Sequence, residues 1–373
     1  MARDGRPLGE LRRGWTTGAC ATAAARAAYE ALLTGVFPDP VEIALPGGQR
    51  PQFALGFHER GADYARAGVM KDAGDDPDVT HGALVIATLR RGSLGAGIVF
   101  RAGEGVGTVT RPGLPIPAGE PAINPGPRAM ISQALAATAE RLGGSLDLEV
   151  EIAIPNGARI AERTLNGRLG IVGGLSILGT TGIVVPYSCS AWIHSIHRGV
   201  DVARASGLRH IAGATGSTSE KAVQDLYGLP EIPLIDMGDF VGGLLKYLRA
   251  HPIEDVTIAG GMAKMSKLGQ GLLDLHSRRG EVDLGWLADQ APAAGGDDAL
   301  SAAIRAANTA KHAFDLARAA GVELAAPVVE AAFATASRAL RDGATRLEIA
   351  VFDRDGVLLA RTGLRALQSS PPR

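Results

Sequence analysis

The chain has 373 residues, more than the roughly 250–300 at which a single hydrophobic core stops growing, so its length favours two domains. Hydrophobic residues make up 46% and charged residues 21%, and no apolar run approaches the roughly 20 residues that span a bilayer, which excludes a helical membrane protein. A net charge of -1 argues against nucleic-acid binding, and two cysteines are too few for a disulfide framework. Together with a polar start that lacks a signal-peptide core, these values predict a cytoplasmic globular protein.

The first part of the chain has strand-like runs grouped between two predicted helices. An alanine-rich helix is expected over residues 17–34, ended by Gly35, and a second helix from Asn124 to about Leu142. The strand-like runs are 41–45, 53–57, 64–70, 83–89, 97–100 and 148–154. This grouping predicts an α+β domain over residues 1–165.

From Gly170 onward the pattern changes to a strand, a glycine turn and a helix, repeated. The expected strands are 183–186, 210–212, 232–235 and 256–259, each followed by a helix. Four such units predict an α/β, Rossmann-like domain with a parallel, doubly wound sheet over residues 166–290. Residues 291–373 are expected to form helices and a β-hairpin, 346–351 with 357–361, that packs back on the first domain.

Charged side chains are concentrated at residues 71–82, KDAGDDPDVTHG, here called the acidic loop. Four carboxylates and one imidazole within twelve residues are more titratable groups than an ordinary surface turn contains. Clustered carboxylates also raise one another's pKa. We therefore interpret Asp75, Asp76 and His81 as candidate catalytic groups that exchange protons. A calcium loop and a solvated turn are the alternatives. Because the spacing lacks the ligand positions and the final glutamate of an EF-hand, no metal site is predicted.

Glycine turns after the predicted strands of the second domain indicate a nucleoside site, because ligands of doubly wound sheets bind at the carboxyl ends of the strands. The candidate cofactor-binding residues are Gly213, Thr215, Gly216, Ser217 and Asp236. No complete dinucleotide or P-loop fingerprint is present, and each loop taken alone is also compatible with a packing turn. The glycines of residues 103–107, GEGVG, fit either close backbone approach to a ligand or a strand bulge.

Five runs together carry a resemblance to a known family. They are GWTTG at 14–18, the acidic loop, GEGVGTVTRPGL at 103–114, GEPAINPGPR at 119–128 and GGLSILGTTGIVVPYS at 173–188. In length and order they resemble the cobalt-precorrin-5B (C-1)-methyltransferase family of anaerobic cobalamin biosynthesis. The resemblance spans about residues 14–276, with Trp15 where tyrosine is expected and Gly126 where a larger residue is usual.

The resemblance implies methyl transfer from S-adenosyl-L-methionine to ring carbon C-1 of cobalt-precorrin-5B, giving cobalt-precorrin-6A on the route to cobalamin (adenosylcobalamin). It also implies two domains, one of them Rossmann-like. We expect that domain to bind the methyl donor, because doubly wound sheets bind nucleosides at their strand ends, and the 1–165 domain to lie on the side of the cobalt-corrinoid substrate. The protein itself then needs no metal, since cobalt arrives inside the substrate.

The corrinoid macrocycle carries carboxylate side arms, and Lys71, Arg128 and Lys264 are the candidate substrate-binding residues for them. A non-catalytic corrinoid-binding protein and another nucleotide-using enzyme are the alternative functions. The sequence leaves the oligomeric state open, a homo-oligomer included.

Overall fold

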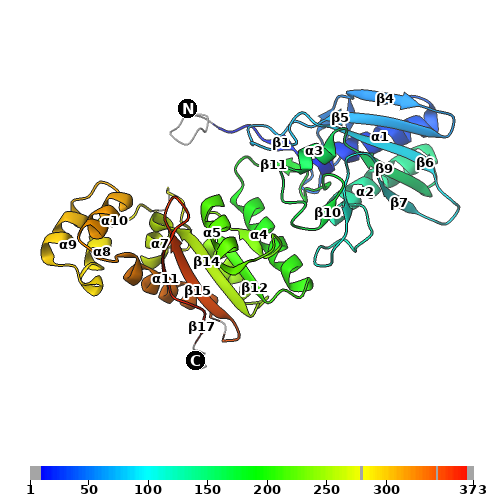
Figure 1. Cartoon of the computed structure of the whole chain (residues 1–373). Helices are drawn as coiled ribbons and strands as arrows, with labels where there is room; N and C mark the ends of the chain where they lie inside the picture. The colour runs from blue at the N-terminus through cyan, green and yellow to red at the C-terminus, as the bar shows by residue number, and fades with distance from the viewer. Residues whose placement is uncertain (1–9, 278–279, 342, 368–373) are drawn as a thin grey trace. The chain divides into compact units, whose positions relative to one another are not determined.

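The computed structural model describes residues 10–277, 280–341 and 343–367 (Figure 1). The chain forms two compact units, residues 1–188 and residues 189–373, each with its own hydrophobic core. Helices occur in both units, and the sheets include parallel and antiparallel pairs, so the mixed α/β class is confirmed. No described helix is long and apolar enough to cross a membrane.

The first unit is built on a five-stranded sheet with two long helices. In spatial order the strands are β4 (Phe57–Arg60), β5 (Tyr64–Met70), β6 (Leu84–Arg91), β9 (Leu148–Ala153) and β7 (Ile98–Ala102). Neighbouring strands are antiparallel except β9 and β7, which are parallel. The helices α1 (Thr17–Thr34) and α2 (Pro125–Leu142) pack together, and α1 lies on β5 and β6 (Figure 1). Alanine supplies most of the buried surface of α1, so this helix approaches the sheet closely.

Shorter elements complete the first unit. They are β1 (Gly14–Trp15), β2 (Val41–Glu42), β3 (Gln52–Phe53), β8 (Thr108–Val109), α3 (Gly157–Ala161), β10 (Ile171–Val172) and β11 (Ile183–Val184). Three antiparallel pairs form among them, β2 with β3, β8 with β10, and β1 with β11. Because β10 and β11 pair inside the first unit, its boundary falls after Ser188 and not at residue 165. The prediction that 183–186 begins the second sheet was therefore wrong.

The second unit contains a sheet in which four neighbouring strands are parallel. In spatial order the strands are β13 (Leu234–Asp236), β12 (His210–Ala214), β14 (Asp255–Gly261), β15 (Arg346–Phe352) and β16 (Leu358–Arg361), with β17 (Arg365–Ala366) also beside β15. The strands β16 and β17 run antiparallel to β15. The parallel sheet therefore carries an antiparallel edge.

Helices cover both faces of the four parallel strands. One face carries α4 (Cys189–Ala205), α6 (Val241–Leu248), α7 (Met262–Gly269) and α11 (Ala325–Leu340), which share the larger core with the sheet. The other face carries α5 (Ser217–Tyr227), packed on Ala212, Ala259 and Phe352. The remaining helical elements are α8 (Leu284–Asp289), the 3-10 turn η1 (Pro292–Ala294), α9 (Asp298–Arg305) and α10 (Ala310–Ala319). Figure 1 shows α8, α9 and α10 as one group, and α10 contacts α7.

The predicted return of the C-terminal hairpin to the first domain is wrong. The strand β15 pairs in parallel with β14 along its whole length, from Arg346 opposite Asp255 to Phe352 opposite Gly261. Every residue of β15 after Arg346 is buried, so both faces of the strand need a covering layer. The interior of the second sheet provides those layers, with α11 on one face and α5 on the other.

Candidate functional site

The carboxyl ends of β12, β13, β14 and β15 meet at one edge of the second sheet. Ala214 at the end of β12 lies beside Asp236 and Ala259, and Gly261 at the end of β14 lies beside Phe352. The chain places β13 on one side of β12 and then β14 on the other, so the strand order reverses between β12 and β14. Open parallel sheets bind ligands at such a reversal, outside the carboxyl ends of the strands. This edge is the candidate cofactor site.

Three of the predicted cofactor-binding residues, Thr215, Gly216 and Ser217, form the turn from β12 into α5. The backbone N–H of Thr215 donates to the carbonyl of Ala259, with 3.0 Å between N and O, which ties the turn to β14. Gly216 is the N-cap of α5, and no atom lies within 4 Å of the position where its Cβ would stand. Gly216 itself makes no side-chain cap hydrogen bond, since a glycine has no side chain, and the backbone N–H groups of the first turn of α5 lie at this edge.

The other two predicted cofactor-binding residues lie in strands. Asp236 ends β13 beside Ala214, at the level of the turn. Gly213 lies within β12, where a Cβ would overlap Leu244 and would stand 3.0 Å from the sulfur of Met237. Packing against α6 therefore explains this glycine. The edge gathers four of the five predicted residues, and Gly213 supports the core beneath them.

Lys264, predicted to bind substrate, lies at the same edge in the first turn of α7. Its ammonium forms an ion pair with Asp239, which follows β13. Burial lowers the pKa of Lys264, and the charge of Lys267 lowers it further. The Nζ of Lys267 donates a hydrogen bond to the backbone carbonyl of Leu275, with 3.1 Å between N and O. The ammonium of this second lysine therefore already has a backbone partner. A partly buried cation with a carboxylate partner thus stands beside the candidate cofactor turn.

Trp192 also lies at this edge, although it is not among the residues predicted from the sequence. It belongs to the first turn of α4, and its side chain is 45% exposed. Its indole N–H donates to the carbonyl of Asp236, with 3.2 Å between N and O. The sequence signal is one tryptophan in a predicted helix, which does not identify a site unless the strand end beside it is known.

The acidic loop connects β5 and β6 in the first unit, and its lysine is paired inside it. Lys71 is 2% exposed, and its Nζ lies 2.7 Å from Oδ2 of Asp78. The other oxygen of Asp78 accepts hydrogen bonds from the backbone N–H and the hydroxyl of Thr80, at 2.7 and 2.6 Å. Burial acts to raise the pKa of Asp78, but the hydrogen bond and charge of Lys71 outweigh it, and the pKa is lowered. The positive charge of Lys71 is therefore neutralised within the loop.

Asp72 and His81 form a second group in the acidic loop. The guanidinium of Arg12 donates to both oxygens of Asp72, and the N–H of Gly74 donates to Oδ1 at 2.9 Å. The hydrogen bond from Arg12, followed by that from Gly74, lowers the pKa of Asp72 to about 2. The His81 ring is 54% exposed, and its Nδ1 accepts from the N–H of Ala73 at 3.1 Å. A neutral His81 therefore carries its proton on Nε2.

Asp75 and Asp76 each accept a hydrogen bond from the backbone of another segment. The N–H of Arg12 lies 2.7 Å from Oδ2 of Asp75, and the N–H of Tyr187 lies 2.8 Å from Oδ1 of Asp76. Asp75, Asp76 and His81 thus share one loop, but each side chain has a different backbone partner, and the two aspartates hold neighbouring chain segments. Among the described residues, no group of three or more His, Cys, Asp and Glu side chains could hold a metal ion.

Arg128, the third predicted substrate-binding residue, fixes the turn before α2. Its Nε donates to the carbonyl of Ile123 at 2.8 Å, and its Nη2 donates to the carbonyl of Pro121 at 3.2 Å. The same nitrogen lies 3.1 Å from the Glu120 carboxylate, and the guanidinium stands over the ring of Phe100, 5.3 Å from its centroid. Its contacts are therefore within the first unit, remote in the chain from the acidic loop.

The glycine motifs of the first unit pack backbone against backbone. A Cβ on Gly105 would overlap the carbonyl of Ile154, and a Cβ on Gly157 or on Gly174 would overlap the backbone of Gly105. Each glycine thus leaves the space that another loop occupies. Packing between loops accounts for the GEGVG motif without a ligand.

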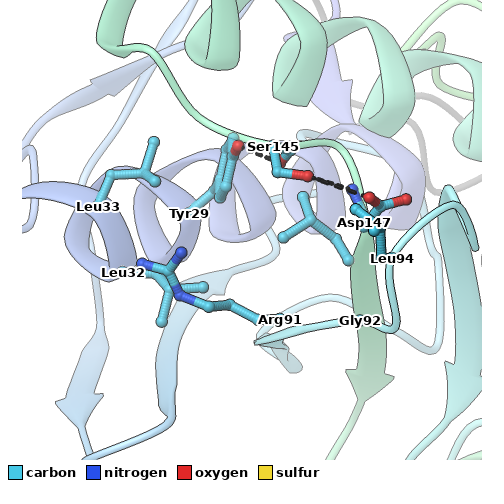
Figure 2. Close-up of a pocket in the computed structure, with 9 residues that line it drawn as sticks. Tyr29, Leu32, Leu33, Arg91, Gly92, Leu94, Ser145 and Asp147 are labelled. Atoms are coloured by element: carbon cyan, nitrogen blue, oxygen red, sulfur yellow. Dashed lines mark hydrogen bonds between the residues drawn. The ribbon is translucent and has the colours of Figure 1, made fainter.

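A cavity of about 180 Å³ lies elsewhere in the first unit, at the C-terminal end of α1 (Figure 2). It is lined by Tyr29, Leu32, Leu33, Arg91, Gly92, Leu94, Ser145, Asp147 and Leu148. Figure 2 shows Ser145 between Tyr29 and Asp147, joined to both by hydrogen bonds. None of the predicted site residues lines this cavity, so it is separate from the candidate site.

Comparison with known proteins gives consistent matches along the chain. The CbiD family model matches residues 5–186, and the model of the CbiD C-terminal domain matches residues 274–363. A crystal structure of the cobalamin biosynthesis protein (cbiD) from Archaeoglobus fulgidus is 28% identical, covering 73% of this chain and 84% of that one, with a TM-score of 0.40.

Three relatives illustrate the sequence similarity. The Bradyrhizobium sp. (strain BTAi1) protein is 64% identical over 100% of this chain and 99% of its own length. The Agrobacterium fabrum protein is 62% identical over 97% of this chain and 95% of its own, and the Brucella abortus (strain S19) protein is 57% identical over 94% and 96%. Each of the three is named cobalt-precorrin-5B C(1)-methyltransferase. With these identities over nearly the full length, the chain belongs to the CbiD family.

Proposed function

We propose that this chain transfers a methyl group from S-adenosyl-L-methionine to C-1 of cobalt-precorrin-5B, giving cobalt-precorrin-6A in cobalamin biosynthesis. The observation that carries the proposal is the methyltransferase name shared by relatives that are 57–64% identical over nearly the whole chain. The same chemistry is therefore expected here.

The reversal of strand order between β12 and β14 supports a cofactor site of the Rossmann-like kind at this edge. Thr215, Gly216 and Ser217 would hold the donor, because Gly216 leaves open space and the first turn of α5 offers backbone N–H groups. Asp236 would bind the ribose hydroxyls, since it ends the neighbouring strand. The residues at this edge thus fit a nucleoside.

When bound, S-adenosyl-L-methionine supplies a methyl carbon that its sulfonium already activates, so the bond from C-1 forms as the carbon–sulfur bond breaks. The protein then has to align the two reactants and keep water away from them. We propose that Asp75, Asp76 or His81 takes up the ring proton that is lost. Because Nδ1 of His81 already accepts from Ala73, a neutral His81 carries its proton on Nε2, and an aspartate is the better proton acceptor.

Among the three proposed partners of substrate carboxylates, Lys264 has the strongest structural support because it lies at the cofactor edge. Lys71 is almost fully buried and paired with Asp78, so it would need the acidic loop to open before it met a side arm. The guanidinium of Arg128 donates hydrogen bonds to backbone carbonyls of the turn before α2, so those N–H groups already have acceptors. Lys264 is therefore the first of the three to test.

The test is calorimetric titration of the protein with S-adenosylhomocysteine, alongside turnover of cobalt-precorrin-5B with S-adenosyl-L-methionine. Gly216→Val places a side chain in the open space at the start of α5, in a backbone conformation that valine adopts without strain. We expect it to weaken S-adenosylhomocysteine binding by at least about tenfold, a loss of about 1.4 kcal/mol.

Gly167→Val is the matched control, because Gly167 in the first unit also has no atom within 4 Å of its Cβ position. This variant should bind like the wild type. If both variants bind S-adenosylhomocysteine with equal affinity, the cofactor site is not at the start of α5. A protein that binds the corrinoid but neither binds S-adenosylhomocysteine nor turns over would be a corrinoid-binding protein instead.

A further inference from the structure

Trp192 is the one aromatic residue among the large hydrophobic side chains that the described chain exposes. Its 45% exposure leaves much of an indole ring in contact with water, although burying such a ring is strongly favourable. Single exposed apolar residues are common, but this one is held in a fixed position. The residues around the ring therefore indicate whether its exposed face could bind a ligand.

Two contacts fix the edge of the ring at the end of β13. The indole N–H donates to the carbonyl of Asp236 at 3.2 Å. The benzene side of the ring stands 3.3 Å from where a Cβ on Gly238 would lie, and this glycine has a positive φ of 52°. Because Gly238 has no side chain, the turn after β13 can pass beneath the ring.

The helix that carries the ring is itself anchored. The next residue, Ile193, stands 3.3 Å from the Cβ position of Gly243 in α6, and Ile196 and Val200 are buried in the larger core. The helix α4 also contacts β13 directly. The ring is thus presented from a rigid element, as precise ligand positioning requires.

We infer that Trp192 stacks on the adenine of the methyl donor. The inference rests on the proposed cofactor site, in which Asp236 would hold the ribose and the base would extend over the adjoining strand end. The Trp192 ring is hydrogen-bonded to the backbone of Asp236, so it lies beside the strand end that the base would adjoin. Aromatic rings stack on nucleobases with a gain that corresponds to about fivefold to a hundredfold in affinity. Trp192 is therefore assigned as a residue that strengthens binding of the nucleoside part of the donor.

The experiment is calorimetric titration of the full-length chain with S-adenosylhomocysteine and with 5′-methylthioadenosine, which share the base and ribose. Trp192→Leu keeps an apolar side chain but removes the aromatic face, and Trp192→Phe keeps an aromatic face but removes the N–H donor. We expect the leucine variant to lose about tenfold or more in affinity for both ligands, and the phenylalanine variant to stay within about threefold of wild type. Trp286→Phe, in α8, is the control and should not change binding.

The outcomes separate this inference from the proposed function. If the wild type binds S-adenosylhomocysteine and Trp192→Leu binds it equally well, the stacking role is wrong and the cofactor site stands. If only corrinoid binding falls in that variant, Trp192 contacts the macrocycle, and the inference is overturned. If the wild type binds neither nucleoside, the cofactor site and the stacking role fail together.

A spectroscopic measurement covers the case in which Trp192→Leu does not fold. The chain has three tryptophans, so Trp15→Phe combined with Trp286→Phe leaves Trp192 as the only one. Its fluorescence should be quenched when S-adenosylhomocysteine binds, because the base would stack on the indole. Binding detected by calorimetry without any change in this emission would contradict the inference.

Discussion

Asp75 illustrates what sequence can and cannot establish about a single residue. The concentration of aspartates in the acidic loop predicts a functional segment, but spacing alone does not reveal a partner from a distant segment. In the structure its carboxylate accepts the N–H of Arg12, and Gly74 beside it packs so closely that a Cβ would overlap the backbone of Arg12 and Arg13. The Asp75 carboxylate therefore has a structural role, which is to hold the segment at Arg12, in addition to the proposed catalytic role.

The variant Asp75→Asn separates these two uses, because the asparagine carbonyl can still accept the hydrogen bond from Arg12. We expect unchanged affinity for S-adenosylhomocysteine and turnover per folded molecule lowered by about a hundredfold, as for loss of a general base. Turnover of cobalt-precorrin-5B, normalised to folded protein, is the measurement. Asp63→Asn, on an exposed turn of the same unit, is the control. Wild-type turnover in Asp75→Asn would end the catalytic interpretation of this residue.

Asp72 gives a prediction about pH. The hydrogen bonds of Arg12 and Gly74 lower its pKa from 3.8 to about 2. A group whose pKa is lower in the folded state stabilises the fold above its unfolded pKa, so its contribution should be complete above pH about 4 and should disappear as the pH falls to about 2.

The measurement is urea unfolding of the wild type and Asp72→Asn at several pH values, with carboxyl NMR to follow Asp72 itself. The difference in unfolding free energy between the two proteins should shrink between pH 4 and 2. Arg12→Ala should move the pKa of Asp72 back toward its ordinary value. A difference that stays constant across this range would show that the pairing with Arg12 is not formed in solution.

At the scale of elements, the sequence predicted most helices and strands near their observed positions but misplaced two strands. The run at 183–186 precedes a helix as a sheet strand would, yet β11 pairs with β1. The run at 346–351 looks like half of a hairpin, yet β15 pairs with β14 as well as with β16. Local pattern reports that a segment is extended, whereas its neighbour in a sheet depends on packing between distant segments.

The end of α5 is tied to the sheet by a buried carboxylate, which supplies an element-scale prediction. Glu348 in β15 is wholly buried and accepts hydrogen bonds from the hydroxyls of Tyr227 and Thr257, the latter at 3.0 Å. Tyr227→Phe removes one hydrogen-bond donor from this buried carboxylate. We expect a loss of about 1.5–3 kcal/mol in unfolding free energy, measured by urea unfolding at pH 8.

Tyr64→Phe is the matched control for Tyr227→Phe, because the partner of Tyr64, Glu59, is 43% exposed and can bind water instead. It should change stability by less than about 0.5 kcal/mol. Burial, followed by the hydrogen bond to Glu348, raises the pKa of Tyr227 to about 12. The stability that Tyr227 contributes should therefore persist to pH about 10 and be lost as the pH rises to about 12. Equal losses in the two variants would contradict this role for Glu348.

At the scale of the whole molecule, the division into two units predicts where the chain can be cut. A fragment ending at Ser188 keeps the core of the first unit, including Leu175 and Ile177, and keeps the pairs that β10 and β11 form. We expect it to fold by itself and to unfold cooperatively. A fragment ending at residue 165 loses those side chains and pairs and should be much less stable. Circular dichroism and thermal unfolding compare the two fragments directly. If they are equally stable, the first domain ends near residue 165, as predicted from the sequence.

The place of β15 in the second sheet also has a consequence for how a ribosome makes this protein. The strand β14 is synthesised 84 residues before β15, its parallel neighbour. At about 5–20 residues per second, the nascent chain waits roughly 4–17 s before that neighbour emerges. During this interval one side of β14 presents unpaired backbone N–H and C=O groups beside apolar side chains, which other nascent chains could join. Newly made copies are thus most vulnerable to misassembly before β15 arrives, and slower translation of residues 262–345 would lengthen that exposure.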